Sequence, residues 1–428
     1  MRVGAAPTST SPVTIPTTIH TVVFGVQSRG DCAGADVRTT YEIIRSCLVT
    51  IAACVYRAIH QNIPDPTLSF WGRLRVTTKV TFYALIAPEL IIWWAMRQWF
   101  GAREVWTHTH GQFAQMGGFG RKDDKRVLHP FTLIKLLRNG QLDIEELQLT
   151  EKEIQDKSKG DILSKGLVAF QTTWFVFECM ARLHQGLPLI ELEVVTLAFA
   201  TLNIITYGLW WYKPLNVLEP RMGMTKRWKA AFLVVIHALK RDFSSRPWYM
   251  TVWERLMKQP FLIIVWPLWE LLNDERIHDE ANHVSTFSAD ELRGDKTLLV
   301  QELSSTIGTV FGAIHFLSWN SAFPTHSQLL LWRISSVVLV VPPFLLLSRS
   351  LIVRLRFQVL HHNPIPRTRS QKLAALLSKC LDVFSIYVSP IPYILARFCV
   401  LGLAFLTLHD LPLSAFDSIS WTSYIPHL

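Results

Sequence analysis

Apolar runs alternate with polar, basic stretches along most of this 428-residue chain. Seven of the runs are long enough for a helix to cross a hydrocarbon core, which takes about 20 residues. Lipid offers no partner to unpaired backbone groups, so such runs predict helices. We therefore predict an all-α fold, a polytopic transmembrane helical bundle with about seven spans plus interfacial or re-entrant helices. The predicted spans are residues 43–60, 80–100, 163–183, 190–212, 299–319, 328–348 and 383–408.

The polar stretches between the runs divide the chain into regions. The predicted regions are a poorly ordered N-terminal tail (1–40), the first two transmembrane helices (41–100), a polar cytosolic appendage (101–162), the third and fourth transmembrane helices (163–212), an interfacial or re-entrant basic region (213–298), the last three transmembrane helices (299–408) and a C-terminal tail (409–428).

Two of these regions need a closer reading. The appendage has amphipathic helical patterns at 129–140 and 150–161, and the second opens with a Thr-x-x-Glu capping box. In the basic region the apolar pieces 230–239 and 261–272 are short for spans. Interfacial or re-entrant helices fit them better than a pair of tilted spans.

Composition strengthens the membrane interpretation. Half of the residues are apolar and only 18% are charged, whereas about a quarter are charged in soluble proteins. The net charge of +10 comes largely from basic residues beside apolar runs, as at 221–229, 348–356 and 367–372. The predicted partners are the lipid bilayer and its anionic headgroups, not nucleic acid.

Basic residues also predict an orientation, because they concentrate on the cytoplasmic side. Three long connecting stretches are rich in Lys or Arg, and two short connectors contain neither. The rich stretches are 101–162, 213–298 and 349–380, and the two connectors are 184–189 and 320–328. This pattern predicts a cytosolic N-terminus and a C-terminus on the far side, but it leaves Arg73, Arg75 and Lys79 on the wrong side.

A carboxylate interrupts the apolar run “YALIAPELIIWWAMRQW” (83–99). Glu89 lies about nine residues into its predicted span, where a charge costs upward of about 2.5 kcal/mol. Its side chain must face protein or water, or be protonated. Pro88 removes a backbone donor, which predicts a kink at the carboxylate. Glu89 is either a structural acid that joins helices or a catalytic or ligand-binding group.

His315 is a second ionisable group inside a predicted span. Gly308 and Gly312 leave one face of that helix bare, so a neighbouring backbone can approach it. His315 falls near this face. We predict it as a catalytic residue with Glu89, and a metal ligand or a packed histidine with one hydrogen bond are the alternatives.

Four further polar residues are predicted binding residues: His60, Asn62, His110 and Arg182. His60 and Asn62 follow the first predicted span. His110 belongs to a His-x-His sequence, which is weak evidence for a metal site without a Cys or carboxylate beside it. Arg182 lies one helical turn after Glu178 and can pair with it. We predict no metal site, and the chain lacks the Walker, nucleophile-elbow and dinucleotide-binding motifs that would name a cofactor.

Several stretches, in order along nearly the whole chain, resemble a family of fungal multi-pass integral membrane proteins of undefined activity. Among them are “RTTYEIIRSCLVTIAACVYRAIHQNIPDP” (38–66), “ALIAPELIIWWAMRQWFGA” (84–102), “ELEVVTLAFATLNIITYGLWWYKPLNV” (191–217) and “FGAIHFLSWNSAFPTHSQLLLWRISS” (311–336). The family pattern features the positions of His60, Asn62, Glu89, His110, Lys213, His315 and Trp332. Relatives often carry a longer N-terminal part outside the membrane, and by that resemblance the orientation is inverted and Cys32 is lumenal.

The resemblance implies a membrane location, in the endomembrane system or the plasma membrane, but little chemistry. We expect a membrane enzyme that acts on a hydrophobic, isoprenoid or lipid-like small molecule in secondary metabolism, with Glu89 as acid or base. The alternatives are a proton- or cation-coupled transporter or sensor, and a non-catalytic membrane scaffold.

Overall fold

The fold is taken from a computed structural model of the chain. It describes residues 37–103, 107–121, 127–128, 133, 149–158, 162–224, 283–284, 286–289, 292, 295–362, 373, 376–378, 380–381 and 384–419. Three predictions therefore lie outside the described residues, or almost so: the N-terminal tail up to residue 36, the helix at 129–140, and the two apolar pieces of the basic region.

The described chain is mostly helical, which confirms the all-α fold class. Its helices are α1 (Thr40–Ala52), the π-helix η1 (Ala53–Arg57), α2 (Phe70–Ile86), α3 (Pro88–Ala102), α4 (His108–Gln115), α6 (Glu151–Asp156), α7 (Ile162–His184), α8 (Glu191–Leu209), α12 (Asp295–Ile314), the 3₁₀-helix η5 (His315–Ser318), α13 (His326–His362), the π-helix η6 (Phe384–Val388), α15 (Pro390–Leu406), and the 3₁₀-helices η7 (Thr407–His409) and η8 (Leu413–Phe416). Two short strands, β1 (Phe119–Arg121) and β2 (Arg221–Met224), pair in parallel.

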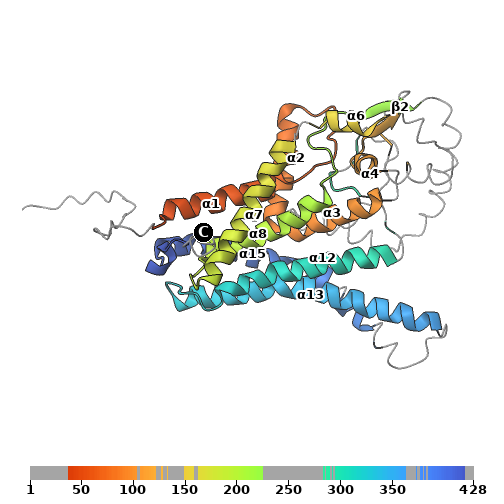
Figure 1. The fold of residues 1–428 in the computed structure, drawn as a ribbon. Helices are drawn as coiled ribbons and strands as arrows, with labels where there is room; N and C mark the ends of the chain where they lie inside the picture. The colour runs from red at the N-terminus through yellow and green to blue at the C-terminus, as the bar shows by residue number, and fades with distance from the viewer. Residues whose placement is uncertain are drawn as a thin grey trace, which may run out of the picture.

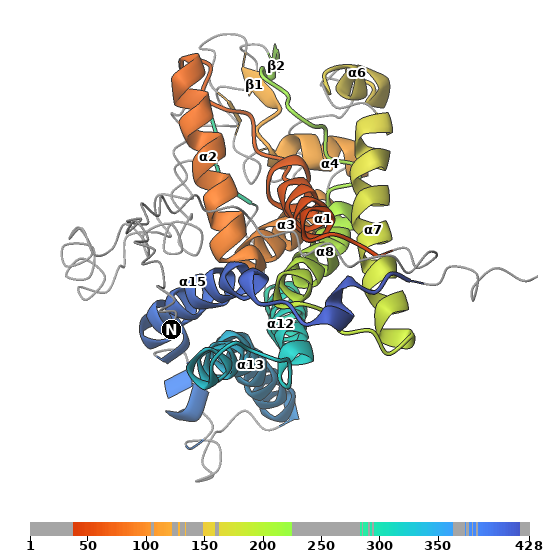
Figure 2. The same cartoon turned by 90° about the vertical axis from the view of Figure 1, so that its left-hand side faces the viewer.

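The long helices form one bundle. In Figure 1, α1, α3, α8, α12 and α13 lie along roughly the same axis, and α12 and α13 lie side by side and antiparallel. Figure 2 looks nearly down α1, α12 and α13 and shows α2 and α7 from the side. The largest buried apolar cluster joins residues of α1, α2, α3, α7, α8 and α15. The bundle core is therefore built mainly from the first half of the chain, and α15 returns to it from the far end.

Local capping signals start several of these helices. Thr39 and Glu42 form a capping box at α1. Thr150 and Glu153 form the predicted one at α6, where Glu153 Oε2 accepts the Thr150 backbone N–H at 2.7 Å. These hydrogen bonds to the charged form lower the pKa of the Glu153 carboxyl. The helix predicted at 150–161 is thus confirmed, although the described part ends at Asp156.

The predicted span at 80–100 is broken. Ala87 has φ −140° and ψ 68°, outside the helical region, and Pro88 is the first residue of the next helix. The axes of α2 and α3 differ by 110°. Proline disfavours a helical residue before it and cannot donate to the preceding turn. The kink predicted at Pro88 is therefore confirmed, and the predicted span at 80–100 consists of two helices that meet at this bend.

The glycine face of α12 is packed as predicted. An added Cβ at Gly312 would lie 2.9 Å from Val340 Cγ2 and 3.0 Å from the Leu339 carbonyl oxygen, so only glycine allows α13 to come this close. Pro342 and Pro343 lie inside α13. A proline leaves the carbonyl four residues earlier without its helical donor, yet α13 continues as one helix through both prolines.

Four described helices are long and apolar enough to cross a membrane: Glu191–Leu209, Asp295–Ser318, His326–Leu355 and Pro390–His409. The bent pair of α2 and α3 makes up to five if it counts as one span. The predicted spans at 43–60 and 163–183 are helical, as α1 with η1 and as α7, but are not among these four. Length and composition thus support four or five spans, fewer than the seven predicted.

The two ends of the described chain meet. Val37 pairs with Asp417 in an antiparallel bridge, and the Arg38 backbone N–H donates to the Phe416 carbonyl at 3.0 Å. We name the region where they meet the terminal end of the bundle: residues 37–39, 185–190, 319–325 and 407–417. The expectation that the N- and C-terminal ends lie on opposite sides was therefore wrong for these residues, because tertiary pairing that the charge pattern does not encode brings them together.

Candidate functional site

Glu89 lies among α3, α12, α13 and α15, at the break that precedes α3. It accepts a hydrogen bond from the Tyr393 hydroxyl of α15. An added Cβ at Gly308 would lie 3.1 Å from both Glu89 Cγ and Pro343 Cβ, so the bare glycine face makes room for this side chain. The carboxylate is partly buried and contacts protein, which is one of the environments that its cost in lipid requires.

Arg397 is fully buried on the same face of α15 as Tyr393, one helical turn further on. Its Nε–H donates to the Leu85 carbonyl at 3.2 Å. Its Cζ lies 4.5 Å from the ring centroid of Phe199 and 4.6 Å from that of Phe311, so two phenyl faces enclose the guanidinium. Glu89 and Arg397 interact electrostatically, but the carboxylate hydrogen-bonds the phenol.

His315 connects to this site through Arg397. Its Nδ1 faces the carbonyls of Phe311 at 3.0 Å and Gly312 at 3.3 Å, so we assign the proton to Nδ1. The unprotonated Nε2 then accepts from Arg397 Nη1 at 3.4 Å. The structure therefore brings both predicted catalytic residues into one group, the Glu89 cluster: Glu89, His315, Tyr393 and Arg397.

Two helices lose regular geometry around the Glu89 cluster, and a third contains two prolines. The chain breaks at Ala87, directly before the carboxylate. The α-helix α12 ends at Ile314 and continues as the 3₁₀-helix that begins with His315. In α13, Pro343 lies against Gly308, beside the Glu89 side chain. Irregular backbone at membrane depth is tolerated where it is buried in protein or lines a cavity.

A second polar group, the Lys213 cluster, lies toward the other end of α3. Its members Asn62, Trp94, Gln98, Trp210 and Lys213 are all buried. Trp94 and Gln98 are one turn apart on α3, Trp210 and Lys213 follow α8, and Asn62 lies between η1 and α2. The cluster therefore joins three separate parts of the chain.

Lys213 is held by neutral groups. Its Nζ donates to Asn62 Oδ1 at 3.1 Å and to Gln98 Oε1 at 2.7 Å. It also lies 4.8 Å from the ring centroid of Trp94 and 4.9 Å from that of Trp210. Burial lowers the pKa of Lys213 well below its usual range. Among the described residues no carboxylate forms an ion pair with it, so two amides and two indole faces are its environment.

His60 packs beside the Lys213 cluster. Its ring lies 5.8 Å from that of Tyr207 and 5.9 Å from that of Trp210, and its Nδ1–H donates to the Ala58 carbonyl at 2.9 Å. Burial is the main cause that lowers its pKa to about 3, and the positive charges nearby add to it. The predicted binding residues His60 and Asn62 are thus close together but distant from Glu89 in the bundle.

The other two predicted binding residues lie elsewhere. His110 Nε2 donates to the Leu149 carbonyl at 2.8 Å, and its Nδ1 lies 2.7 Å from Thr107 Oγ1. Arg182 is buried at the terminal end, where it donates to the carbonyls of Asp417 at 2.7 Å and Pro188 at 3.1 Å. Both residues join segments of the fold, and a ligand-binding role stays a prediction for each.

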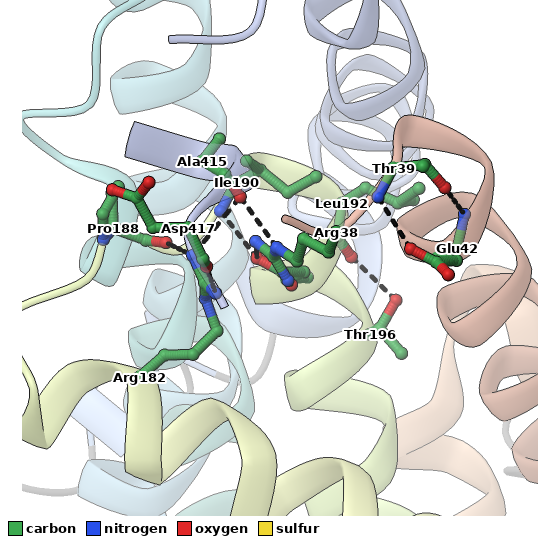
Figure 3. A network of polar contacts seen from close by, with 11 residues as sticks. Arg38, Thr39, Glu42, Arg182, Pro188, Ile190, Leu192, Thr196, Ala415 and Asp417 are labelled. Atoms are coloured by element: carbon green, nitrogen blue, oxygen red, sulfur yellow. Dashed lines mark hydrogen bonds and ion pairs between the residues drawn. The ribbon is translucent and has the colours of Figure 1, made fainter. Parts of the chain in front are cut away.

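The terminal end owes its structure to two arginines (Figure 3). Arg38 forms an ion pair with Glu193 and donates from Nε to the Ala415 carbonyl at 2.7 Å. Arg182 binds the same segment, and its predicted partner Glu178 is not hydrogen-bonded to it. Guanidinium groups suit this position because one fork of donors satisfies several carbonyls.

Sequence reasoning missed Tyr393, Arg397, Gln98 and the role of Lys213 in a cluster. Arg397 was detectable, because it is a charge inside an apolar span just as Glu89 is. Gln98 is neutral and gave a weaker signal. Within the described residues no three His, Cys, Asp or Glu side chains are grouped to hold a metal ion.

These features define a helical protein with membrane-length apolar helices and a core of mutually interacting ionisable groups. The chain belongs to a family of unknown function (DUF8562), whose model matches residues 25–127 and 101–240 and so covers half of the chain. No curated protein and no solved structure matches it. Glu89 and the Lys213 cluster fall within the matched part, whereas His315, Tyr393 and Arg397 lie beyond it.

Proposed function

We propose that this chain is a membrane protein that binds a hydrophobic small molecule beside α3, α12 and α15 and exchanges a proton at Glu89. The observation that best supports the proposal is the hydrogen bond of the Glu89 carboxylate. Glu89 accepts it from the Tyr393 phenol and is not hydrogen-bonded to Arg397. A phenol donates to an ionised carboxylate and accepts from a protonated one, so Glu89 has a partner in either state.

An enzyme is the first form of this proposal. Glu89 acts as general acid or base on an isoprenoid or lipid-like substrate, and Arg397 stabilises negative charge that develops on a substrate oxygen. His315 and two phenyl rings hold the guanidinium in place. The convergence of ionisable groups from separate helices supports this form. A place in secondary metabolism stays a prediction.

A proton-coupled carrier is the second form. The helix break at Ala87 and Pro343 of α13 lie next to the Glu89 cluster. Discontinuous helices at the middle of a bundle are typical of substrate sites in secondary transporters. The same carboxyl would then release its proton on one side of the membrane and accept it on the other.

The proposal is tested by following the carboxyl proton directly. Infrared difference spectra of the purified protein between acid and alkaline pH should contain a carboxyl band that disappears in Glu89→Gln, because the amide does not titrate. Glu302→Gln is the matched control, since that carboxylate is paired with Arg354 at 2.6 Å. A Glu89→Gln spectrum identical to the wild type over this pH range would end the proposal.

The enzyme and the carrier predict different results for lipid-soluble extracts of the host cell. For an enzyme, lipid-soluble extracts of cells with the wild type should hold a product that is missing with Glu89→Gln. For a carrier, the extracts should match, and liposomes loaded with a pH-sensitive dye should take up protons only with the wild type when extract is added. A third outcome, lower thermal stability in Glu89→Gln with neither effect, is expected of a scaffold.

We also infer a sidedness for the membrane. The chain leaves the terminal end through α1 and reaches the Lys213 cluster, and α2 and α3 then enter and return as a re-entrant pair, with the 110° bend inside. Arg73, Arg75 and Lys79 then lie on the same side as the other basic stretches, which removes the conflict in the charge pattern. With α1 and α7 also crossing, the basic side is cytosolic and the terminal end faces the opposite side.

Engineered glycosylation tests this sidedness. The chain contains no Asn-x-Ser/Thr sequence, so one acceptor in a short flexible insertion reports on one loop at a time. Insertions at residue 186 and at residue 411 should both be glycosylated in a eukaryotic host, and an insertion at residue 157 should not. Glycosylation at 157, or at only one of the two terminal-end positions, would contradict the arrangement.

A further inference from the structure

Arg397 has a hydrogen-bond donor that finds no acceptor among the described residues. A guanidinium carries five N–H groups. Nε donates to the Leu85 carbonyl and Nη1 approaches His315 Nε2. Nη2 is buried and has no hydrogen-bond partner in the described part of the chain. An orphaned donor on a charged, fully buried side chain is costly, which indicates that it meets an acceptor in another state of the protein.

The guanidinium is also held rigidly. Two phenyl faces fix its plane, at 4.5 and 4.6 Å from Cζ, and two hydrogen bonds fix its orientation. Such a group binds a planar oxyanion without losing conformational freedom of its own. Glu89 is the only acidic residue described as interacting with Arg397, and its carboxylate is hydrogen-bonded to Tyr393.

The protonation state of Glu89 therefore decides whether the Arg397 guanidinium has a counter-ion within the protein. When Glu89 is ionised, it compensates the guanidinium. When Glu89 is protonated, Arg397 is a buried cation without a counter-ion. In a low-dielectric interior this state strongly favours entry of one negative charge.

We propose that Arg397 binds the carboxylate of an amphipathic organic acid when Glu89 is protonated, so that the protein takes up the anion and the proton together. The inference rests on the proposed proton exchange at Glu89 and names the ligand class of that site. The charge count favours a monoanion, because a phosphate dianion would bring one charge too many. The phenyl rings beside Arg397 and the apolar helices favour an apolar tail. Glu89, the partly exposed member of the cluster, marks the side of entry.

The test measures binding of radiolabelled laurate to the purified full chain in nanodiscs at several pH values. The wild type should bind laurate more tightly as the pH falls and Glu89 becomes protonated. Glu89→Gln imitates the protonated carboxyl. It should bind at alkaline pH at least about 10-fold more tightly than the wild type, within the range typical of linked sites, and its affinity should no longer depend on pH.

Arginine variants complete the test. Arg397→Gln should lose laurate binding, and Arg397→Lys should retain part of it because the charge stays while the fork is lost. Arg333→Gln is the matched control, since Arg333 of α13 is half-buried and makes a solvent-exposed hydrogen bond to the Trp319 carbonyl at 2.9 Å. The gain of affinity in Glu89→Gln cannot result from misfolding, so it keeps the proposal decidable if Arg397→Gln does not fold.

Three results would overturn the inference. These are an unchanged or weaker affinity in Glu89→Gln, full affinity in Arg397→Gln, and tighter binding of dodecyl phosphate than of laurate, which would point to a lipid headgroup. Dodecanol, which has the tail but no charge, should compete poorly. If laurate does not bind but the titrating carboxyl band still disappears in Glu89→Gln, only this inference is refuted. If the spectrum contains no band that depends on Glu89, the proposed function is refuted as well.

Discussion

Replacing Gln98 with leucine is expected to lower the free energy of unfolding by about 3 kcal/mol or more, with hydrogen bonds as the main cause. The fully buried Gln98 amide makes four of them. It donates to Asn62 Oδ1 and to the Ser288 carbonyl, each at 2.9 Å, and accepts from Trp210 Nε1 at 3.1 Å and Lys213 Nζ at 2.7 Å. Leucine has a similar volume, so the loss reports on polar groups and not on a cavity.

Much of the stability lost in Gln98→Leu comes from one donor, the Trp210 indole N–H. Asn62 Oδ1 keeps its bond from Lys213, and the Ser288 carbonyl keeps its bond from Trp94 Nε1 at 3.0 Å. The Trp210 indole N–H keeps no partner, and an orphaned buried donor costs about 1 to 3 kcal/mol by itself. Lys213 loses its shorter hydrogen bond at the same time.

Thermal unfolding followed by tryptophan fluorescence measures the effect. Gln171→Leu is the matched control. Gln171 is a partly buried glutamine of α7 with a hydrogen bond to Thr50 Oγ1 at 3.2 Å, and a neutral hydrogen bond of this kind contributes about 1 kcal/mol. Equal destabilisation by the two substitutions would show that the Lys213 cluster does not hold the fold together.

Acid is expected to destabilise the protein through His60. Its pKa is about 3 in the folded state, against 6.5 for a free histidine. The unfolded chain therefore binds a proton below pH 6.5 that the folded chain refuses, and stability is lost as the pH falls from 6.5 to 3. Such a difference in pKa corresponds to about 5 kcal/mol over that interval. Below pH 3 both states are protonated and the contribution of His60 stops changing.

His60→Phe should reduce this acid sensitivity. The phenyl ring keeps the packing against Tyr207 and Trp210 but cannot titrate, so the melting temperature should fall less between pH 7 and pH 4 than in the wild type. At pH 7 the variant should be slightly less stable, because the bond to the Ala58 carbonyl is lost. His409→Gln is the control, since the side chain of His409 is 89% exposed. An unchanged pH dependence in His60→Phe would refute the prediction.

The sequence predicts those elements of the fold that local interactions determine. Pro88 marks the helix break, Gly308 and Gly312 mark the close approach of two neighbours, and Thr150 with Glu153 marks a helix start. The angle at the break was not readable. A proline says that a helix stops, but tertiary packing decides where the next one points.

The sequence predicted two of the four residues of the Glu89 cluster, Glu89 and His315, for a related reason. Glu89 and His315 stand out because each is an ionisable group in an apolar run, whereas their link through Arg397 joins positions that are 82 residues apart at the closest. Tyr393 gave no signal, because a phenol is ordinary in a membrane helix. The Lys213 cluster escaped because its organising residue, Gln98, carries no charge.

The meeting of the two described chain ends makes folding depend on contacts between residues that are far apart in the sequence. Arg38 and Arg182 donate to carbonyl groups of Ala415 and Asp417, which follow them by 377 and 235 residues. The helix α1 therefore cannot complete its contacts until α15 and the segment after it have been synthesised and have packed against it. A chain that stops before residue 415 would leave this end of the molecule open.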